Sequence, residues 1–239
     1  MSQNIQSSFE TTLKDSSLEN LAIDLSELTI DNLTNEGILK EVPIIGTLVN
    51  LARFGANIKD RLFLKKIVYF LDKLKDIPID QRKKMIEEID GSEKFRLKVG
   101  EKLLYIIDSC NDYENSEIAA VLFKAFIEGK ITYDAFLESS NIIMKITSQD
   151  FQWFLKNGQK YMYVEDIGGL LSSGLFDLNY EPIDIRVEEE TDHKVLLEGG
   201  NKYKTDVDGG NMRVSTSRAG EIILEVFSPT YKKPKVLKI

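Results

Sequence analysis

The sequence predicts a mainly α-helical protein with a small α+β unit in its C-terminal part. Two patterns along the chain support this prediction. Over residues 17–146, apolar residues recur at three- and four-residue spacing, which lines them along one face of each expected helix. Over residues 183–216 the spacing becomes two, which is typical of strands. We therefore expect an N-terminal, bundle-like helical domain over 17–146 and an α+β unit with a long β-hairpin insertion over 147–228.

The composition is that of an ordinary globular protein, with 239 residues, 42% of them hydrophobic and 29% charged. A net charge of −8 disfavours general affinity for nucleic acid, which depends on neutralising phosphates with Lys and Arg. The single cysteine excludes an intramolecular disulfide and a metal site built from cysteines. Residues 1–16 are polar and lack the pattern of a secretory signal, so we expect a flexible tail there and a cytoplasmic protein. Residues 229–239 form a second, basic tail.

The longest apolar run, residues 42–58, lies in the segment around which we expect the helical domain to pack. Pro43 suits a first helical turn, because the N–H groups of that turn have no partner within the helix. The spacing of Ile44, Leu48, Ile58 and Leu62 assigns them to one apolar face, and Arg53 lies inside the run. A helix that spans a bilayer needs about 20 mainly apolar residues, so this shorter run predicts a core helix.

The same segment leaves a second interpretation open, in which its helix lies on or enters a membrane. The small residues of the run and the basic residues after it suit an anionic lipid surface. An acidic stretch before the run would then cover the helix until it is released. The surface that a membrane or a partner would contact comprises Ile44, Leu48, Leu51, Arg53, Lys59, Arg61, Lys65 and Lys66.

Capping residues and helix breakers delimit the other helices of the domain. Ser16 and Glu19 have the spacing of a capping box, and Ile77 ends a helix because it precedes a proline. Thr132 is a further N-cap, and Gly91 a stop. We expect helices over residues 18–28, 43–76, 80–90, 92–110, 115–128 and 132–146.

The C-terminal unit mixes short helices with strands. A helix ends at "SSGLF" (residues 172–176), and "RVSTSRAGEIILEVF" (residues 213–227) predicts a strand that runs into a final helix. The turn-forming sequence Asp208–Asn211 predicts the turn of a β-hairpin. The expected elements are helices over 151–155, 163–173 and 221–227, and strands over 183–187, 203–207 and 212–216.

This order of elements resembles the close of a winged-helix domain, over residues 147–228. The resemblance implies DNA binding through the helix at 163–173 and a wing, although residues 181–210 would be a long insertion in that wing. Segment 38–75 also looks similar to uncharacterised bacterial helical proteins, and this likeness implies no activity.

The charges argue against DNA binding by this unit. The helix in the recognition position has no Lys or Arg and carries Glu165 and Asp166, which phosphates would repel. The candidate contacts for nucleic acid are therefore confined to the basic tail. They are Lys232, Lys233 and Lys235.

No pattern of catalytic, metal-binding or cofactor-binding residues is present. Cys110 falls on an apolar face and is expected to be a buried, inert thiol, and His193 stands in a charged stretch. Asp206 and Asp208 resemble the start of a calcium loop, but position twelve is Ser217 where a Glu is required. We expect a non-catalytic interaction or regulatory protein that docks a protein partner through the winged-helix-like unit, without a cofactor. A DNA-binding transcriptional regulator and a membrane-active bacterial (anti-phage) defence effector remain the alternatives.

Overall fold

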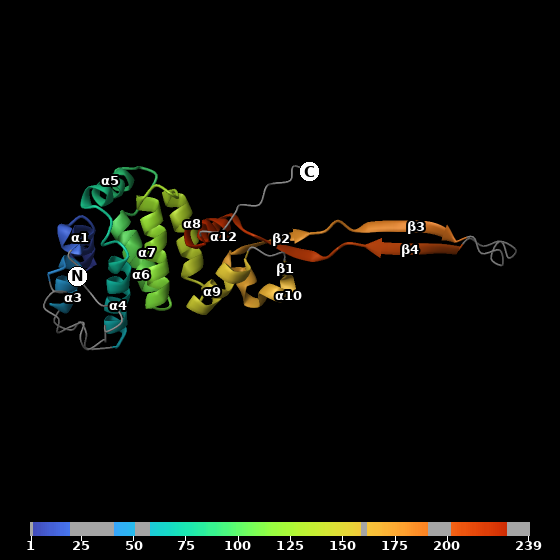
Figure 1. The fold of residues 1–239 in the computed structure, drawn as a ribbon, viewed down its shortest axis with the longest axis horizontal. Coiled ribbons are helices and arrows are strands. Elements are labelled where there is room, and N and C mark those ends of the chain that lie inside the picture. Colours follow the sequence, from blue (N-terminus) through green and yellow to red (C-terminus); the bar gives the residue numbers. More distant parts are fainter. Residues whose placement is uncertain (1, 20–40, 51–57, 159–161, 191–201, 229–239) are drawn as a thin grey trace. The chain divides into compact units, whose positions relative to one another are not determined.

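The computed structural model describes residues 2–19, 41–50, 58–158, 162–190 and 202–228 (Figure 1). The chain divides into two compact units. The first comprises residues 1–158 and 218–239, and the second comprises residues 159–217. The described part is mainly helical, with its antiparallel strands in the second unit, so the predicted fold class is confirmed.

The N-terminus begins with a packed helix where the sequence predicted a flexible tail. Helix α1 (Ser2–Leu13) buries Phe9, Thr12 and Leu13 completely. The hydroxyl oxygen of Thr12 accepts a hydrogen bond from the backbone N–H of Ile44, at 3.0 Å. The prediction for residues 1–16 was wrong because a helix with so few apolar residues becomes stable only through its tertiary contacts.

The turn after α1 also differs from the predicted capping box. Asp15, not Ser16, is the N-cap of the short 3-10 helix η1 (Ser16–Leu18), and its carboxylate accepts from the N–H of Ser17 at 2.7 Å. The buried side chain of Arg82 donates to the carbonyl oxygen of Asp15 at 3.1 Å, so this turn is fixed to the rest of the unit. Apart from residues 18 and 19, the helix expected over residues 18–28 lies outside the described residues.

The apolar run at 42–58 forms a shorter helix than predicted. Helix α3 (Pro43–Val49) starts at the proline, as expected, but ends at its C-cap Asn50. Helix α4 (Ile58–Asp72) begins after residues that the structure does not describe. Ile58 and Leu62, which the spacing assigned to the buried face, are exposed.

The helices α5 (Ile79–Asp90), α6 (Val99–Ser109), α7 (Tyr113–Ile127) and α8 (Tyr133–Ile143) follow. Helix α7 packs against α4 and α8 and is buried along most of its length (Figure 1). Phe123 of α7 lies 6.2 Å from Phe70 of α4 and 5.3 Å from Phe136 of α8, measured between ring centroids. These rings form the centre of the first unit's core.

Helix α6 starts seven residues later than predicted. Its first N–H, that of Val99, donates to the carboxylate of Asp90 at 2.8 Å. Gly91 ends α5, as predicted. The connection that follows is exposed except for Ser92 and Phe95, and the ring of Phe95 lies against that of Tyr133. The sequence could not place this start, because Lys98 at the N-cap position makes no capping hydrogen bond with its side chain. The carboxylate of Asp90, in the preceding helix, accepts that bond instead.

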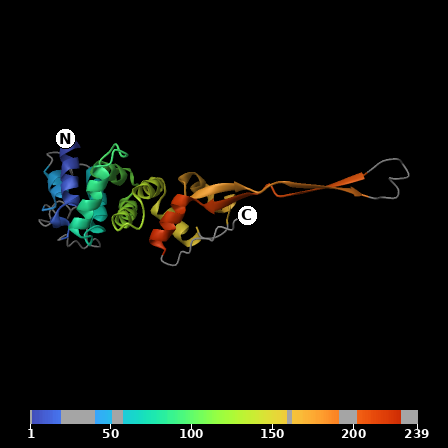
Figure 2. The same ribbon diagram turned by 90° about the horizontal axis from the view of Figure 1, so that it is seen from above.

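The domain boundary predicted at residue 147 also differs from the structure. Helices α9 (Ser148–Asn157) and α12 (Arg218–Phe227) belong to the first unit. The ring of Phe151 in α9 meets that of Phe227 in α12 edge to face, 5.0 Å apart, and α12 packs against α8 (Figures 1 and 2). The second unit is therefore inserted between two helices of the first.

The second unit contains little helix. The predicted helix over residues 163–173 is α-helical only in α10 (Val164–Ile167), and continues as the 3-10 helix η3 (Gly168–Ser173). Gly168 and Gly169 explain the change, since glycine disfavours a helix interior and Gly168 has a φ of +49°. The strands are β1 (Met162–Tyr163), β2 (Phe176–Tyr180), β3 (Asp184–Glu190), β4 (Lys202–Asp208) and β5 (Met212–Thr216).

The strands form one sheet of order β1-β5-β2 and a two-stranded ladder of β3 with β4, all antiparallel. The turn predicted at Asp208–Asn211 is absent, because β5 pairs with β2 and not with β4. Tyr180 pairs with Met212 and Asp184 pairs with Asp208, so the register is the same on both sides of this point. The two ladders are thus consecutive parts of one long antiparallel pair of chain segments.

The interruption between the two ladders has a local cause. Pro182 has no N–H to donate, and Gly209 and Gly210 both have positive φ values, +89° and +75°. A Cβ on Gly209 would collide with the carbonyl oxygen of Pro182. The glycine pair therefore lets the two strands approach each other where pairing is interrupted, and it does not reverse the chain.

Candidate interaction surface

The ladder of β3 and β4, here called the ribbon, has one apolar face. Ile185 stands opposite Val207, Val187 stands opposite Thr205, and Tyr203, which pairs with Glu189, lies further along the same face. Its apolar side chains are exposed by 58% to 63%. They are Ile185, Val187, Tyr203 and Val207, together with Ile183, which directly precedes β3.

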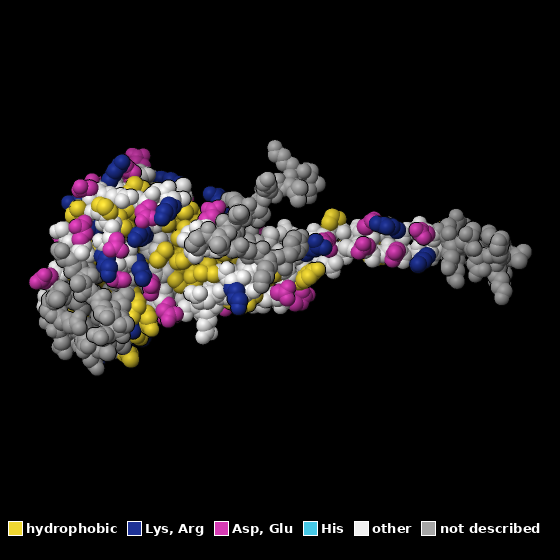
Figure 3. All heavy atoms as spheres, in the orientation of Figure 1, with side chains coloured by type: hydrophobic (Ala, Val, Ile, Leu, Met, Phe, Trp, Pro, Cys, Tyr) yellow, Lys and Arg dark blue, Asp and Glu magenta, His cyan; other side chains and the backbone are white. Residues whose placement is uncertain are grey.

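The opposite face of the ribbon is charged. Arg186 stands opposite Asp206, and Glu188 stands opposite Lys204. The guanidinium group of Arg186 also donates two hydrogen bonds to Asp184 on its own strand, each of 3.1 Å. Figure 3 shows acidic and basic side chains along the visible side of the ribbon. This face has the composition expected of a surface in water.

The ladder of β2 with β5 carries a second group of exposed apolar side chains. Tyr180 and Met212, directly opposite each other in β2 and β5, are both exposed, and so is Leu178. Apolar positions are even-numbered here and odd-numbered in the ribbon, so the apolar pattern shifts by one residue across the interruption at Pro182 and Gly209. In the same sheet, Val214 and Phe176 are buried and anchor this end of the ladder.

A two-stranded ribbon with an uncovered apolar face is at best marginally stable alone in water, and a further strand or layer stabilises it. Single exposed apolar residues need no explanation, but a continuous row of them on one face marks a contact surface. The chemistry of this face permits packing and no bond-making step. The ribbon is therefore a candidate docking surface.

The candidate surface predicted in segment 42–66 is not brought together as one surface. Ile44 and Leu48 are completely buried in α3, whereas Lys59 is exposed at the start of α4. Leu51 and Arg53 lie outside the described residues. Ile44 and Leu48 thus have the core role that the sequence favoured.

The basic residues of α4 make contacts within the first unit. Lys66 donates through Nζ to the carbonyl oxygens of Asp108 and Cys110, at 3.0 and 2.5 Å, at the end of α6. Lys65 lies 3.9 Å from the ring centroid of Tyr113, and Arg61 is half-buried. Lys66 therefore stabilises a helix C-terminus, where a cation is favoured. Lys232, Lys233 and Lys235 lie outside the described residues.

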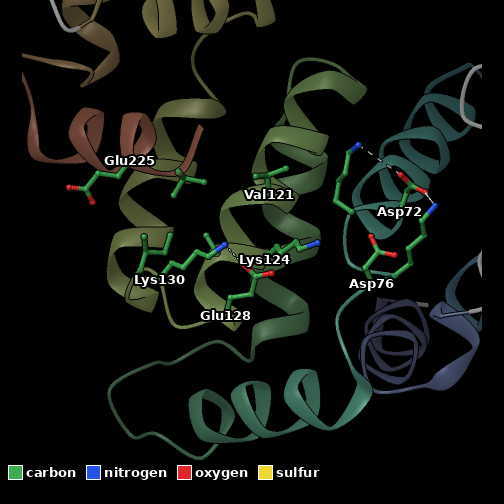
Figure 4. Close-up of a pocket in the computed structure, with 12 residues that line it drawn as sticks. Asp72, Asp76, Val121, Lys124, Glu128, Lys130 and Glu225 are labelled. Carbon is green, nitrogen blue, oxygen red and sulfur yellow. Dashed lines mark hydrogen bonds and ion pairs between the residues drawn. The ribbon is translucent and has the colours of Figure 1, made fainter. Parts of the chain in front are cut away.

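A groove of about 710 Å³ opens between α4, α7 and α12 (Figure 4). Three of its lysines have carboxylate partners at 2.6 to 2.8 Å: Lys73 with Glu117, Lys75 with Asp72 and Lys130 with Glu128. Its floor contains Val121 and Ala125 of α7. The lining carries four acidic and four basic side chains, so the groove presents no excess of one charge to a charged ligand.

Two kinds of chemistry, a reactive thiol and a metal site, can be checked in the described residues. Cys110 is buried, and this burial raises the pKa of its thiol to about 12, although Lys66 acts in the opposite direction. A thiol with this pKa supplies almost no thiolate at neutral pH, so Cys110 is not a nucleophile. In the described ranges no group of three or more His, Cys, Asp or Glu side chains is placed to hold a metal ion. His193 lies outside those ranges.

None of the helices that the structure describes is both long and apolar enough to cross a bilayer. Comparison of the sequence with protein-family models, with curated proteins and with solved structures finds no match.

The sequence predicted strands over 183–187 and 203–207, and these residues lie in the ribbon. It did not predict that the apolar face of the ribbon is exposed. A period of two shows which side chains share a face, and a half-buried strand and an uncovered ribbon have the same period. The available sequence signal was the charged face, which alternates with the apolar face on both strands and leaves neither strand the continuous apolar character of a central strand.

Proposed function

We propose that the chain is a non-catalytic intracellular interaction protein that docks a protein partner through the apolar face of the ribbon. The observation that carries the proposal is the exposure of five large apolar side chains in two adjacent rows on one face. Covering each of these side chains would contribute roughly 25 cal/mol for every Å² of apolar surface removed from water. A winged-helix-like unit is part of this proposal, with the ribbon in the position of the wing.

Charge supports a protein partner over DNA. Glu165 and Asp166 are both exposed on α10, the element in the recognition position. Residues 159–217 carry twelve acidic and six basic side chains. A surface of this charge repels a phosphate backbone and cannot gain from counterion release. An exposed apolar face on an acidic unit suits a protein surface with an apolar groove.

Site-specific photo-crosslinking in cells tests the proposal. A photoreactive side chain replaces Val187 on the apolar face or, as a matched control, its neighbour Glu188 on the charged face. We expect discrete protein adducts from position 187 and few from position 188. Mass spectrometry identifies the adducts. Equal labelling from both positions, or none from position 187, would contradict docking through this face.

A further inference from the structure

We propose that the guanidinium group of Arg82 and the N-terminal end of helix α5 form a binding site for a small oxyanion of the phosphate class, at the position where the carboxylate of Glu19 lies. The site belongs to the first unit, so it goes beyond the docking function proposed for the ribbon. It is defined by a buried cation that uses only some of its hydrogen-bond donors.

The side chain of Arg82 is completely buried. Its Nη2 donates to the carbonyl oxygen of Asp15 at 3.1 Å and lies 3.5 Å from Oε1 of Glu19. Nε and Nη1, which carry the other N–H groups, have no hydrogen-bond partner among the described residues. Burial lowers the pKa of Arg82, and Glu19 and Asp15 offset only part of this shift. Because buried donors are normally paired, this guanidinium group can bond further acceptor oxygens.

Helix α5 adds backbone donors beside this cation. Helical side chains tilt toward the N-terminus, so the side chain of Arg82, the fourth residue of α5, points back toward the first turn. The N-cap residue, Pro78, provides no side-chain cap. Instead Oε1 of Glu19 accepts from the N–H of Ile79 at 3.0 Å, so one oxygen contacts both the helix terminus and Arg82. First-turn N–H groups and an arginine side chain are donors that suit a phosphate.

Glu19 holds this position weakly. Its side chain is 41% exposed, and its contact with Nη2 is longer than the usual range of about 2.7–3.2 Å. A phosphate offers three strong acceptor oxygens, so it can bond two nitrogens of the guanidinium group while it accepts from the N–H of Ile79. Because Glu19 lies at the surface, it can turn into water and open the buried guanidinium group to the ligand.

The neighbouring carboxylates restrict the ligand to a small anion. Asp15 directs its carboxylate to the N–H of Ser17, at 2.7 Å, and Asp80 is exposed in the first turn of α5. These acids leave the donors of Arg82 to the ligand, but they repel any further phosphates attached to it. A single phosphate group therefore fits this site better than a polyanion does.

Titration calorimetry of the full chain with inorganic phosphate tests the inference, at an ionic strength held constant with chloride. Glu19→Gln removes the competing charge and keeps an oxygen for the N–H of Ile79. Since phosphate then displaces no carboxylate, we expect it to bind roughly tenfold more tightly than to the wild type. Glu88→Gln is the matched control, because it makes the same change of charge at an exposed position near the other end of α5. It should bind phosphate as the wild type does.

Arg82→Lys tests the cation itself. Lysine keeps the positive charge but loses the planar group that bonds two oxygens, so phosphate affinity should fall by roughly tenfold. Circular dichroism shows whether this variant folds. If it does not, the comparison of Glu19→Gln with Glu88→Gln decides the question alone.

Methyl phosphate, titrated in parallel, distinguishes two sources of the ligand. Binding of both probes supports a site for phosphomonoesters, and binding of inorganic phosphate alone supports a site for the free ion. Equal phosphate affinities for the wild type and Glu19→Gln would indicate an adventitious ion only and overturn the inference. No binding by Glu19→Gln at about 10 mM phosphate, or full binding by folded Arg82→Lys, would also overturn it. None of these outcomes affects the photo-crosslinking test of the ribbon.

Discussion

Asn115 connects two helix ends inside the first unit. Its side chain is completely buried, and its amide nitrogen donates to the carbonyl oxygens of Ile143 and Ile146, at 2.9 and 2.7 Å. Asn115→Ala would leave the first of these buried acceptors without this donor. We expect a loss of about 2–3 kcal/mol in the free energy of unfolding, measured by urea denaturation.

Asn111→Ala is the matched control for this prediction. Asn111 is exposed and also donates to Ile146, at 3.0 Å, so water can replace it and Asn115 still serves the same acceptor. Its loss should cost under about 1 kcal/mol. Equal losses for the two variants would show that burial of the amide does not determine its contribution.

Cys110 makes stability depend on alkaline pH. Its folded-state pKa of about 12 lies above the reference value of 9.0, because burial penalises the thiolate. Between these values the unfolded chain releases the proton and the folded chain keeps it, so the free energy of unfolding falls as pH rises from 9 to 12. Cys110→Ala should make this fall less steep, by up to about 1.4 kcal/mol per pH unit.

Denaturation curves measured at several pH values check this prediction. Part of the fall should remain in the variant, because burial also raises the pKa of Tyr133 to about 12. Identical slopes for the wild type and Cys110→Ala above pH 9 would show that the thiol titrates in the same way folded and unfolded.

At the scale of elements, the interruption beside Gly209 controls whether the ribbon forms. Gly209→Ala would place a methyl group against the backbone carbonyl of Pro182 at a φ of +89°. Rotating a side chain relieves neither this collision nor the strain of the left-handed backbone conformation. We expect amide hydrogens of β3 and β4 to exchange at least tenfold faster. Exchange in α7 should not change, because α7 belongs to the other unit.

Gly169→Ala is the control, since an added Cβ there has no neighbour within 4 Å and the backbone is not left-handed. It should leave exchange in the ribbon unchanged. The prediction fails if Gly209→Ala exchanges as the wild type does.

At the scale of the whole molecule, the first unit is completed by a helix from the far end of the sequence. Ile223 and Leu224 of α12 are completely buried, and α12 packs on α8 and α7. A chain that ends at Gly158 should lose several kcal/mol of stability, since burying each such side chain contributes about 1.5–3 kcal/mol. Replacing residues 159–217 by a flexible Gly/Ser linker should preserve stability, because α12 is retained.

Thermal denaturation of the two shortened chains, monitored by circular dichroism, measures the difference. Equal melting temperatures would show that α12 contributes nothing to the first unit. A large loss with the linker would show that the second unit stabilises the first.

The sequence by itself determined the class of fold and most helix ends, because both depend on neighbouring residues. Pro43 starts α3, Gly91 ends α5, and Thr132 caps α8 by accepting from the N–H of Ala135 at 3.2 Å. Thr147 and Asp150 form a capping box that starts α9 at Ser148, a signal that the prediction of a helix over 151–155 did not use. Each of these signals acts within four residues, so it can be read along the chain.

Only the tertiary structure decided which elements are covered. Helix α1 is stable because α3 and α6 bury it, and β5 pairs with β2 rather than with β4, its neighbour in sequence. The ribbon's alternation was present in the sequence, but its exposure was not. Periodicity assigns side chains to a face, and burial depends on whether residues distant in the chain pack against that face.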